Sequence, residues 1–318
     1  MLALGIAPAP PGWRLAMWDE YRAARLHAVA STEELWRVLR DLQDAHPAMP
    51  AVLPSGLGIP VTRAGDLLDQ DIAEMAPPAL PGDADGLAAL LIEARRRIPR
   101  ALCIPAVKLL PTVPLHRKLG RTDLGGADAL CIGAWALYCL QRTGVSLETI
   151  CTLLLCRQSA VRTLLVIREG RIVDGLGESS LGLLPPRASG RGGAGRPADQ
   201  RPVPFRARDP LTLREAERRL PEGARLAERE AIRKEILGLA AHHGIHRLIA
   251  LGAAGSEAGS DLDGGLERLI LPEAGKGFEA PLGGAILAAG LTGGPTADLV
   301  DRLGLREARE RPPDWLDP

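Results

Sequence analysis

Two widely separated parts of the chain open with the same strand pattern, and this repetition constrains the fold more than any single motif. Leu2–Ile6 is an apolar run that ends in a proline-rich turn before Trp13–Trp18, which predicts two short strands. Ile150–Cys156 and Val161–Arg168 predict a second pair, and a Glu169-Gly170 turn leads into a further strand. Strand and helix patterns alternate after each pair. The sequence therefore predicts an α/β protein in which helices pack on partly parallel sheets.

Helical patterns fill most of the segments between these strands. Ser31–His46 carries a serine and a glutamate spaced as a capping box, and apolar residues then recur on one face. Further helices are predicted over residues 86–97, 126–142, 211–220, 225–242, 280–291 and 296–303, and further strands over 51–53, 101–104, 246–252 and 266–271. We expect two lobes, residues 1–145 and 146–318, with a cleft between them. Proline, glycine and arginine dominate residues 179–210, which predicts a flexible connector.

Composition excludes several classes of function. Lysine plus arginine and aspartate plus glutamate number 39 each, so no net charge attracts nucleic acid or an anionic membrane. Five tryptophans, two tyrosines and two phenylalanines are too few for base-stacking platforms. The five cysteines contain no C-x-x-C motif, which favours reduced thiols in a cytoplasmic protein. The first residues lack a signal-peptide pattern, and the uncharged run 280–297 is interrupted by glycines and prolines, so we expect no membrane span.

The segment Ile104–Cys131 concentrates chemically active side chains among prolines and glycines. Arginine offers a planar fork to carboxylate or phosphate oxygens, lysine a point charge, and aspartate a cation ligand or a base. A binding loop and a charged surface turn explain this composition equally well. The choice between them depends on resemblance.

The runs Leu110–Lys118 (LPTVPLHRK) and Asp123–Asp128 (DLGGAD) resemble a family of predicted butyrate kinases. That family belongs to the superfamily of acetate and sugar kinases, heat-shock chaperones and actin. Three further segments resemble the same family in the same order, namely Pro54–Pro60, Glu169–Gly177 and Gly283–Gly294. The resemblance therefore rests on several matches along the chain.

The resemblance implies an actin-like, ribonuclease H-like ATPase fold. Its two related domains each contain a five-stranded mixed sheet, and the cleft between them holds a nucleotide. Glycine-rich hairpin turns cradle the phosphates, because glycine lets backbone N–H groups approach phosphate oxygens. ATP and Mg²⁺ are the implied cofactors, and a small carboxylate is the implied acceptor of the phosphoryl group. The sequence leaves homodimer formation open.

The matched positions supply the candidate site residues. Arg117 or Arg121 would grip the acceptor oxygens, and Lys118 or His116 would stabilise developing charge. The predicted catalytic residues are His116, Arg117, Asp123 and Asp128. The predicted substrate-binding residues are Ser55, Lys118 and Arg121. The predicted nucleotide-binding residues are Gly175, Gly252, Gly255, Ser256 and Gly284. Asp123 or Asp128 would serve as a metal ligand or as a base, and no residue is assigned as a dedicated metal ligand. Structural alternatives are a loop hydrogen bond for His116 and helix capping for Asp123 and Asp128.

The chain departs from the family pattern at both phosphate-binding turns. Ala7 occupies the first-hairpin position where relatives carry an aspartate, and Pro8 and Pro10 lack backbone donors. The second turn, Cys156–Ala160, keeps only its last two residues small. One hypothesis is an ATP-dependent kinase acting on a carboxylate. The other is a degenerate relative that binds a nucleotide, small ligand or partner without phosphoryl transfer.

Three histidines lie at or just after the C-terminal end of the predicted helix 225–242. His242, His243 and His246 offer nitrogen ligands to a metal ion, but cationic side chains are also favoured at a helix C-terminus. We prefer the second explanation.

Overall fold

The computed structural model describes residues 1–9, 12–76, 86–119, 121, 123–158, 161–177, 221–252, 264–271 and 277–312. The predicted connector 179–210 and the predicted helix 211–220 lie outside these residues, as do Gly255 and Ser256. All statements below concern the described residues.

The first sheet has six strands in the order β3-β2-β1-β4-β6-β5. They are β1 (Leu2–Ala9), β2 (Gly12–Asp19), β3 (Arg22–Val29), β4 (Ala51–Val52), β5 (Gly58–Arg63) and β6 (Leu102–Pro105). β1, β2 and β3 form an antiparallel meander, β4 is parallel to β1 and β6, and β5 is antiparallel to β6. The hairpin predicted at the start of the chain is thus present, extended by the unpredicted strand β3.

The second sheet has five strands in the order β11-β10-β7-β8-β9. They are β7 (Cys151–Gln158), β8 (Val161–Arg168), β9 (Arg171–Leu176), β10 (Arg247–Gly252) and β11 (Glu267–Leu269). β7, β8 and β9 are antiparallel neighbours, and β10 runs parallel to both β7 and β11. Two mixed sheets with helices confirm the predicted α/β class, although the first sheet has six strands instead of five.

Most helices of the described residues follow the predicted segments, whereas α2 and α4 were not predicted. They are α1 (Thr32–Ala45), α2 (Asp69–Met75), α3 (Leu87–Arg97), α4 (Leu115–Leu119), α5 (Ala127–Arg142), α7 (Pro221–His243), α9 (Glu279–Leu291) and α10 (Ala297–Arg302). The predicted capping of α1 is present, because the Ser31 hydroxyl accepts from the Glu34 N–H at 3.2 Å and Glu34 accepts from the Ala30 N–H at 2.9 Å. No helix among these residues is both long and apolar enough to cross a membrane.

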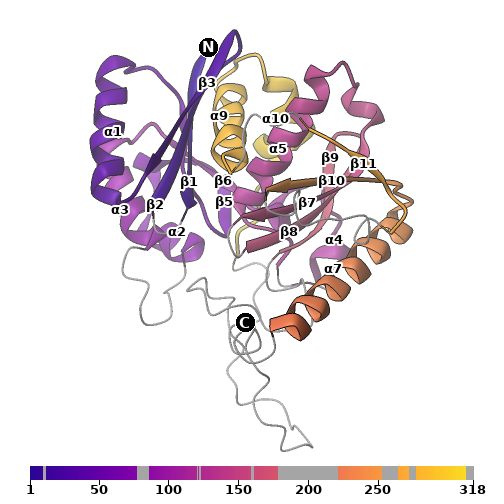
Figure 1. The fold of residues 1–318 in the computed structure, drawn as a ribbon. Coiled ribbons are helices and arrows are strands. Elements are labelled where there is room, and N and C mark those ends of the chain that lie inside the picture. The colour runs from indigo at the N-terminus through magenta and orange to yellow at the C-terminus, as the bar shows by residue number, and fades with distance from the viewer. Residues whose placement is uncertain are drawn as a thin grey trace, which may run out of the picture.

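Two central helices, α5 and α9, separate the sheets (Figure 1). α1 and α3 cover the opposite face of the first sheet, and α7 covers the opposite face of the second. α9 comes from the C-terminal half of the chain but packs on β1, where a Cβ on Gly5 would lie only 1.9 Å from the Pro281 carbonyl oxygen. Its own Gly283 lies against α5 at Cys131. Glycine therefore permits both close approaches that join the two halves.

Candidate functional site

The segment from β6 to α5 connects the two sheets. It passes through a short 3₁₀ helix, Val107–Leu109, and then α4. The Thr112 hydroxyl donates to the Ile172 carbonyl on β9 at 2.6 Å, and the Val107 N–H donates to the Gly125 carbonyl at 3.1 Å. The polar side chains of this segment therefore lie at the junction with the second sheet.

Arg117 on α4 forms an ion pair with Asp174, a fully buried residue of β9. His243, the last residue of α7, places its Nε2 3.0 Å from the same Asp174 carboxylate. These three residues form the Arg117–Asp174–His243 cluster. β9 is the edge strand, and β8 and β7 separate it from the β10 strand that ends at Gly252. The structure therefore does not bring Arg117 beside Gly252.

His243 has a partner that the sequence interpretation did not include. His242 and His243 lie in the last turn of α7, as predicted, and the imidazole of His243 in addition contacts the Asp174 carboxylate. Burial lowers the pKa of His243 most strongly; Asp174 opposes this, while charges on His242 and Arg117 add to it. No local sequence pattern indicated this contact, because Asp174 and His243 are 69 positions apart.

We expect the stability of the protein to fall as the pH drops below about 6.5, the ordinary value for histidine. The lowered pKa of His243 means that the unfolded chain binds a proton more readily than the folded chain. The stabilising contribution is therefore complete above the unfolded value and is lost as the pH falls. Urea unfolding between pH 5 and 7.5 measures this slope. His243→Gln should flatten it, whereas His27→Gln on the exposed face of β3 should not; equal slopes for the wild type and His243→Gln would contradict the assignment.

Two predicted substrate-binding residues, Lys118 and Ser55, have side-chain partners within the protein. Lys118 is 2 % exposed, and its Nζ lies 2.5 Å from Glu310 Oε2. The Ser55 hydroxyl donates to the Leu53 carbonyl at 3.0 Å and accepts from the Ile104 N–H at 3.1 Å, which links the ends of β4 and β6. His116 is exposed on α4, and the half-buried Arg121 accepts a hydrogen bond from Lys108 at its carbonyl oxygen.

Asp123 shapes the approach to α5. Its Oδ1 accepts from the Gly125 N–H at 2.8 Å, and its carbonyl oxygen accepts from the Gly177 N–H at 3.2 Å. A Cβ on Gly177 would lie 2.0 Å from the Asp123 carboxylate, and one on Gly175 would lie 2.2 Å from the Leu124 carbonyl oxygen. The Asp123 side chain therefore fills the space beside Gly177, and the Leu124 carbonyl group fills the space beside Gly175.

A second group of polar residues gathers where α5 and α9 begin. Asp128 lies in the first turn of α5, and Glu279, which is 4 % exposed, is the first residue of α9. Burial raises the pKa of Cys156 well above its ordinary value, and the charges of Glu279 and Asp128 raise it further. The charges of both carboxylates therefore act on the thiol at the end of β7. We call Asp128 and Glu279 the acidic pair.

The surroundings of the acidic pair come from both sheets. Arg14 on β2 donates to the Gly277 carbonyl, and its guanidinium lies 5.2 Å from the centre of the Phe278 ring. These two contacts fix the residues just before Glu279. Arg14 is also the cross-strand partner of Ala7. At the second sheet, Gly252 pairs in register with Arg157, the residue after Cys156. Of the predicted residues, Asp128 and Gly252 thus lie at the same end of this sheet.

Gly284 lies further along α9, in contact with β1. A Cβ there would lie 3.4 Å from the Gly5 Cα and 3.7 Å from the Cys131 sulfur. Gly284 therefore serves helix packing in this structure. Glu279 was not predicted; the only sequence signal was an acid immediately before the glycine-rich helix.

The acidic pair alone is an incomplete metal site. In the described part of the chain, no group of three or more His, Cys, Asp or Glu side chains could hold a metal ion. Mg²⁺ is often bound by one or two carboxylates together with substrate phosphates and water, and the acidic pair fits that donor set. A pocket of about 430 Å³ lies elsewhere, between α1 and the end of α3, and is lined by Trp36, Leu39, Arg40, Gln43 and Arg97.

The chain is a mixed α/β protein with two sheets around a central helix pair, the architecture that the resemblance to actin-like ATPases implied. It belongs to the family described as "Protein of unknown function (DUF1464)", whose model matches residues 17–188, more than half of the chain. A comparison with curated proteins gives no match.

Three solved structures show a distant likeness. Acetate kinase from Entamoeba histolytica is 10 % identical, with a TM-score of 0.46 over 79 % of this chain and 82 % of that chain. The ethanolamine utilization protein EutJ from Carboxydothermus hydrogenoformans is 10 % identical, with a TM-score of 0.37 over 90 % and 89 %. The PilM-PilN type IV pilus biogenesis complex contains a chain that is 14 % identical, with a TM-score of 0.42 over 91 % and 98 %. Because each TM-score is below 0.5, these likenesses do not indicate what this chain binds.

Proposed function

We propose that this chain is a kinase-like nucleotide-binding protein that takes ATP as its Mg²⁺ complex at the acidic pair. The observation that carries the proposal is the close packing of α9 on α5 near their N-termini, at Gly283 and Cys131, with Asp128 in the first turn of α5 and Glu279 at the start of α9. Helix N-termini favour phosphate, because their first N–H groups are unpaired within the helix and the helix dipole is positive there. Gly252 at the end of β10 would lie on the nucleotide side.

The metal ion is needed for charge balance. Two carboxylates near one another repel the phosphates of a free nucleotide, whereas Mg²⁺ neutralises both and bridges them. Asp128 and Glu279 would hold the ion, and it would supply charge stabilisation at the transferred phosphoryl group. Nucleotide binding should therefore depend strongly on Mg²⁺.

Phosphoryl transfer to a carboxylate such as acetate or butyrate is expected to be weak or absent. Ala7 is buried in β1 and provides no carboxylate, and its cross-strand partner Arg14 is held by the Gly277 carbonyl. Arg117 and Lys118 would have to exchange Asp174 and Glu310 for an acceptor carboxylate. A site lacking one charge-stabilising group typically loses about 10²–10³-fold in rate. We therefore favour the non-catalytic, or nearly inactive, member of the two hypotheses.

Isothermal titration of the full chain with ATP tests the proposal. We expect binding in Mg²⁺, little binding in EDTA, and about tenfold or greater weakening in Asp128→Asn and in Glu279→Gln, because each substitution removes a charged ligand. Asp298→Asn is the matched control, since Asp298 also lies in the first turn of a helix but is exposed. Unchanged affinity in the Asp128→Asn, Glu279→Gln double variant would remove the proposed site.

Turnover assays on the same protein distinguish the two hypotheses. Acetate, propionate and butyrate should give little acyl phosphate in the presence of Mg²⁺ and ATP. Robust turnover that is lost in Arg117→Ala or Asp123→Ala would instead establish the carboxylate kinase and the predicted catalytic residues of the loop.

A further inference from the structure

The last described residues of the chain return to its N-terminal half. Glu310 lies 2.5 Å from Lys118 on α4, and Arg311 forms ion pairs with Asp71 and Glu74 on α2. These contacts span 192 to 240 positions in the sequence. They connect the segment after α10 to α2 and α4, two helices that are far from it in the sequence.

The two acids of α2 are arranged to receive one guanidinium. Asp71 and Glu74 are three positions apart, so both project from the same side of the helix, and both side chains are 7 % exposed. Asp71 Oδ2 accepts from the Leu68 N–H at 2.7 Å, and Glu74 Oε1 accepts from Gln70 at 2.8 Å. The remaining oxygen of each carboxylate contacts Arg311. Without Arg311, two buried like charges would face one another without this cation.

α2 in turn holds the Ser55–Leu57 turn. The Met75 carbonyl oxygen, at the end of α2, accepts from the Leu57 N–H at 3.0 Å. Gly56 has a φ of +52°, and a Cβ there would lie 2.2 Å from the same Met75 oxygen, so the turn fits closely against the helix. The Gly56 carbonyl oxygen then accepts from the Ala127 N–H at 2.9 Å. Ala127 is the first residue of α5 and directly precedes Asp128.

Glu310 contacts the second segment, α4, through Lys118. Lys118 is almost fully buried, and its ammonium group lies against Glu310. Its helix, α4, leads through Asp123 and Gly125 into α5. The two consecutive residues Glu310 and Arg311 thus contact both segments that converge on the first turn of α5.

We propose that Glu310 and Arg311 form an ionic clasp that positions the Ser55–Leu57 turn and the first turn of α5. Closing the clasp orders the N-terminus of α5, and releasing it loosens this region while the two sheets stay folded. Arg311 and Glu310 are therefore positioning residues, which act through α2 and α4. The proposal concerns the protein itself and holds whether or not a nucleotide binds.

Hydrogen exchange of the full chain, followed by mass spectrometry, tests the clasp. In Arg311→Ala, the amides of Leu57, Ala76 and Ala127 should exchange about tenfold faster than in the wild type, while those of β8 keep their rates. Arg311→Lys should give an intermediate rate, because lysine keeps the charge but not the planar fork.

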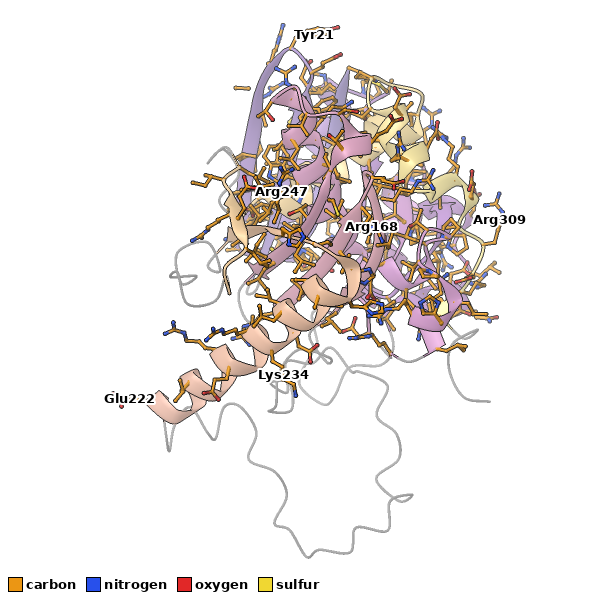
Figure 2. All side chains as sticks on the ribbon, turned by 90° about the vertical axis from the view of Figure 1, so that its right-hand side faces the viewer. Tyr21, Arg168, Glu222, Lys234, Arg247 and Arg309 are labelled. Atoms are coloured by element: carbon orange, nitrogen blue, oxygen red, sulfur yellow. The ribbon has the colours of Figure 1, made fainter. Side chains whose placement is uncertain are left out.

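Arg309→Ala is the matched control. Figure 2 shows Arg309 at the surface, and its guanidinium donates only to the nearby Arg306 and Ala308 carbonyl oxygens in the contacts described. Its exchange pattern should match the wild type. Glu74→Gln, which removes one of the two acids, should accelerate the same amides if Arg311→Ala does not fold. Unchanged exchange at Leu57 and Ala127, or equal acceleration throughout β8 and α9, would overturn the proposal.

Discussion

Gly283→Ala is expected to lower the free energy of unfolding by about 3 kcal/mol or more. The added Cβ would lie 1.7 Å from the Cys131 carbonyl oxygen and 2.5 Å from its carbonyl carbon. Both atoms belong to the backbone of α5, so no side chain can rotate away and the two central helices must separate. Separation also loosens the contacts that α9 makes with β1. Urea unfolding monitored by tryptophan fluorescence measures the change.

Gly238→Ala is the control for this substitution. Gly238 also lies within a helix, α7, but a Cβ there meets nothing within 4 Å. Alanine is favoured over glycine in a helix by about 0.5–1 kcal/mol, so this variant should be slightly more stable than the wild type. A neutral result for Gly283→Ala would contradict the close packing of α5 and α9.

Asp174→Asn is expected to cost about 3–5 kcal/mol. The substitution keeps the shape of the side chain but leaves the buried charge of Arg117 without its carboxylate partner, and it weakens the contact with His243. Removing one member of a buried pair is more damaging than removing both. Asp174→Asn combined with Arg117→Met should therefore recover part of the loss, as measured by unfolding at pH 7.5.

The exposed pair Arg247–Glu267 provides the comparison. It joins β10 to β11, and its side chains are 47 % and 62 % exposed. Solvent screening limits such pairs to about 1 kcal/mol or less, so Glu267→Gln should have little effect. If Asp174→Asn were no more destabilising than Glu267→Gln, the Arg117–Asp174–His243 cluster would not be a structural anchor.

Local sequence patterns predicted most of the fold. Leu2–Ile6 and Cys151–Cys156 lie in strands, and Ser31 caps α1 as expected, because apolar periodicity and capping depend on neighbouring residues. β3 was missed because it is an edge strand with mostly exposed side chains, so it carries no apolar alternation. α2 was missed because it spans only seven residues and follows the 3₁₀ helix Ala64–Asp66 almost directly.

The site was less predictable, because its contacts join residues far apart in the chain. The loop residues Arg117 and Lys118 were singled out by type, but nothing near them in sequence indicates Asp174 or Glu310 as their partners. Asp128 was predicted as a catalytic residue. Glu279 was not, because only the packing of α9 against α5 brings its helix beside that of Asp128. Sequence spacing identifies which side chains can perform chemistry; it does not determine which carboxylate a buried cation will contact.

The packing of α9 on β1 has a consequence for how the chain is made. β1 leaves the ribosome early, but the helix that covers its inner face is synthesised roughly 270 residues later. At about 5–20 residues per second, the apolar surface around Ala3, Ala7 and Trp18 stays uncovered for tens of seconds. The N-terminal sheet therefore completes its fold only after the second sheet has been made. During that interval the uncovered face of β1 is the part of the N-terminal sheet that is most exposed to aggregation.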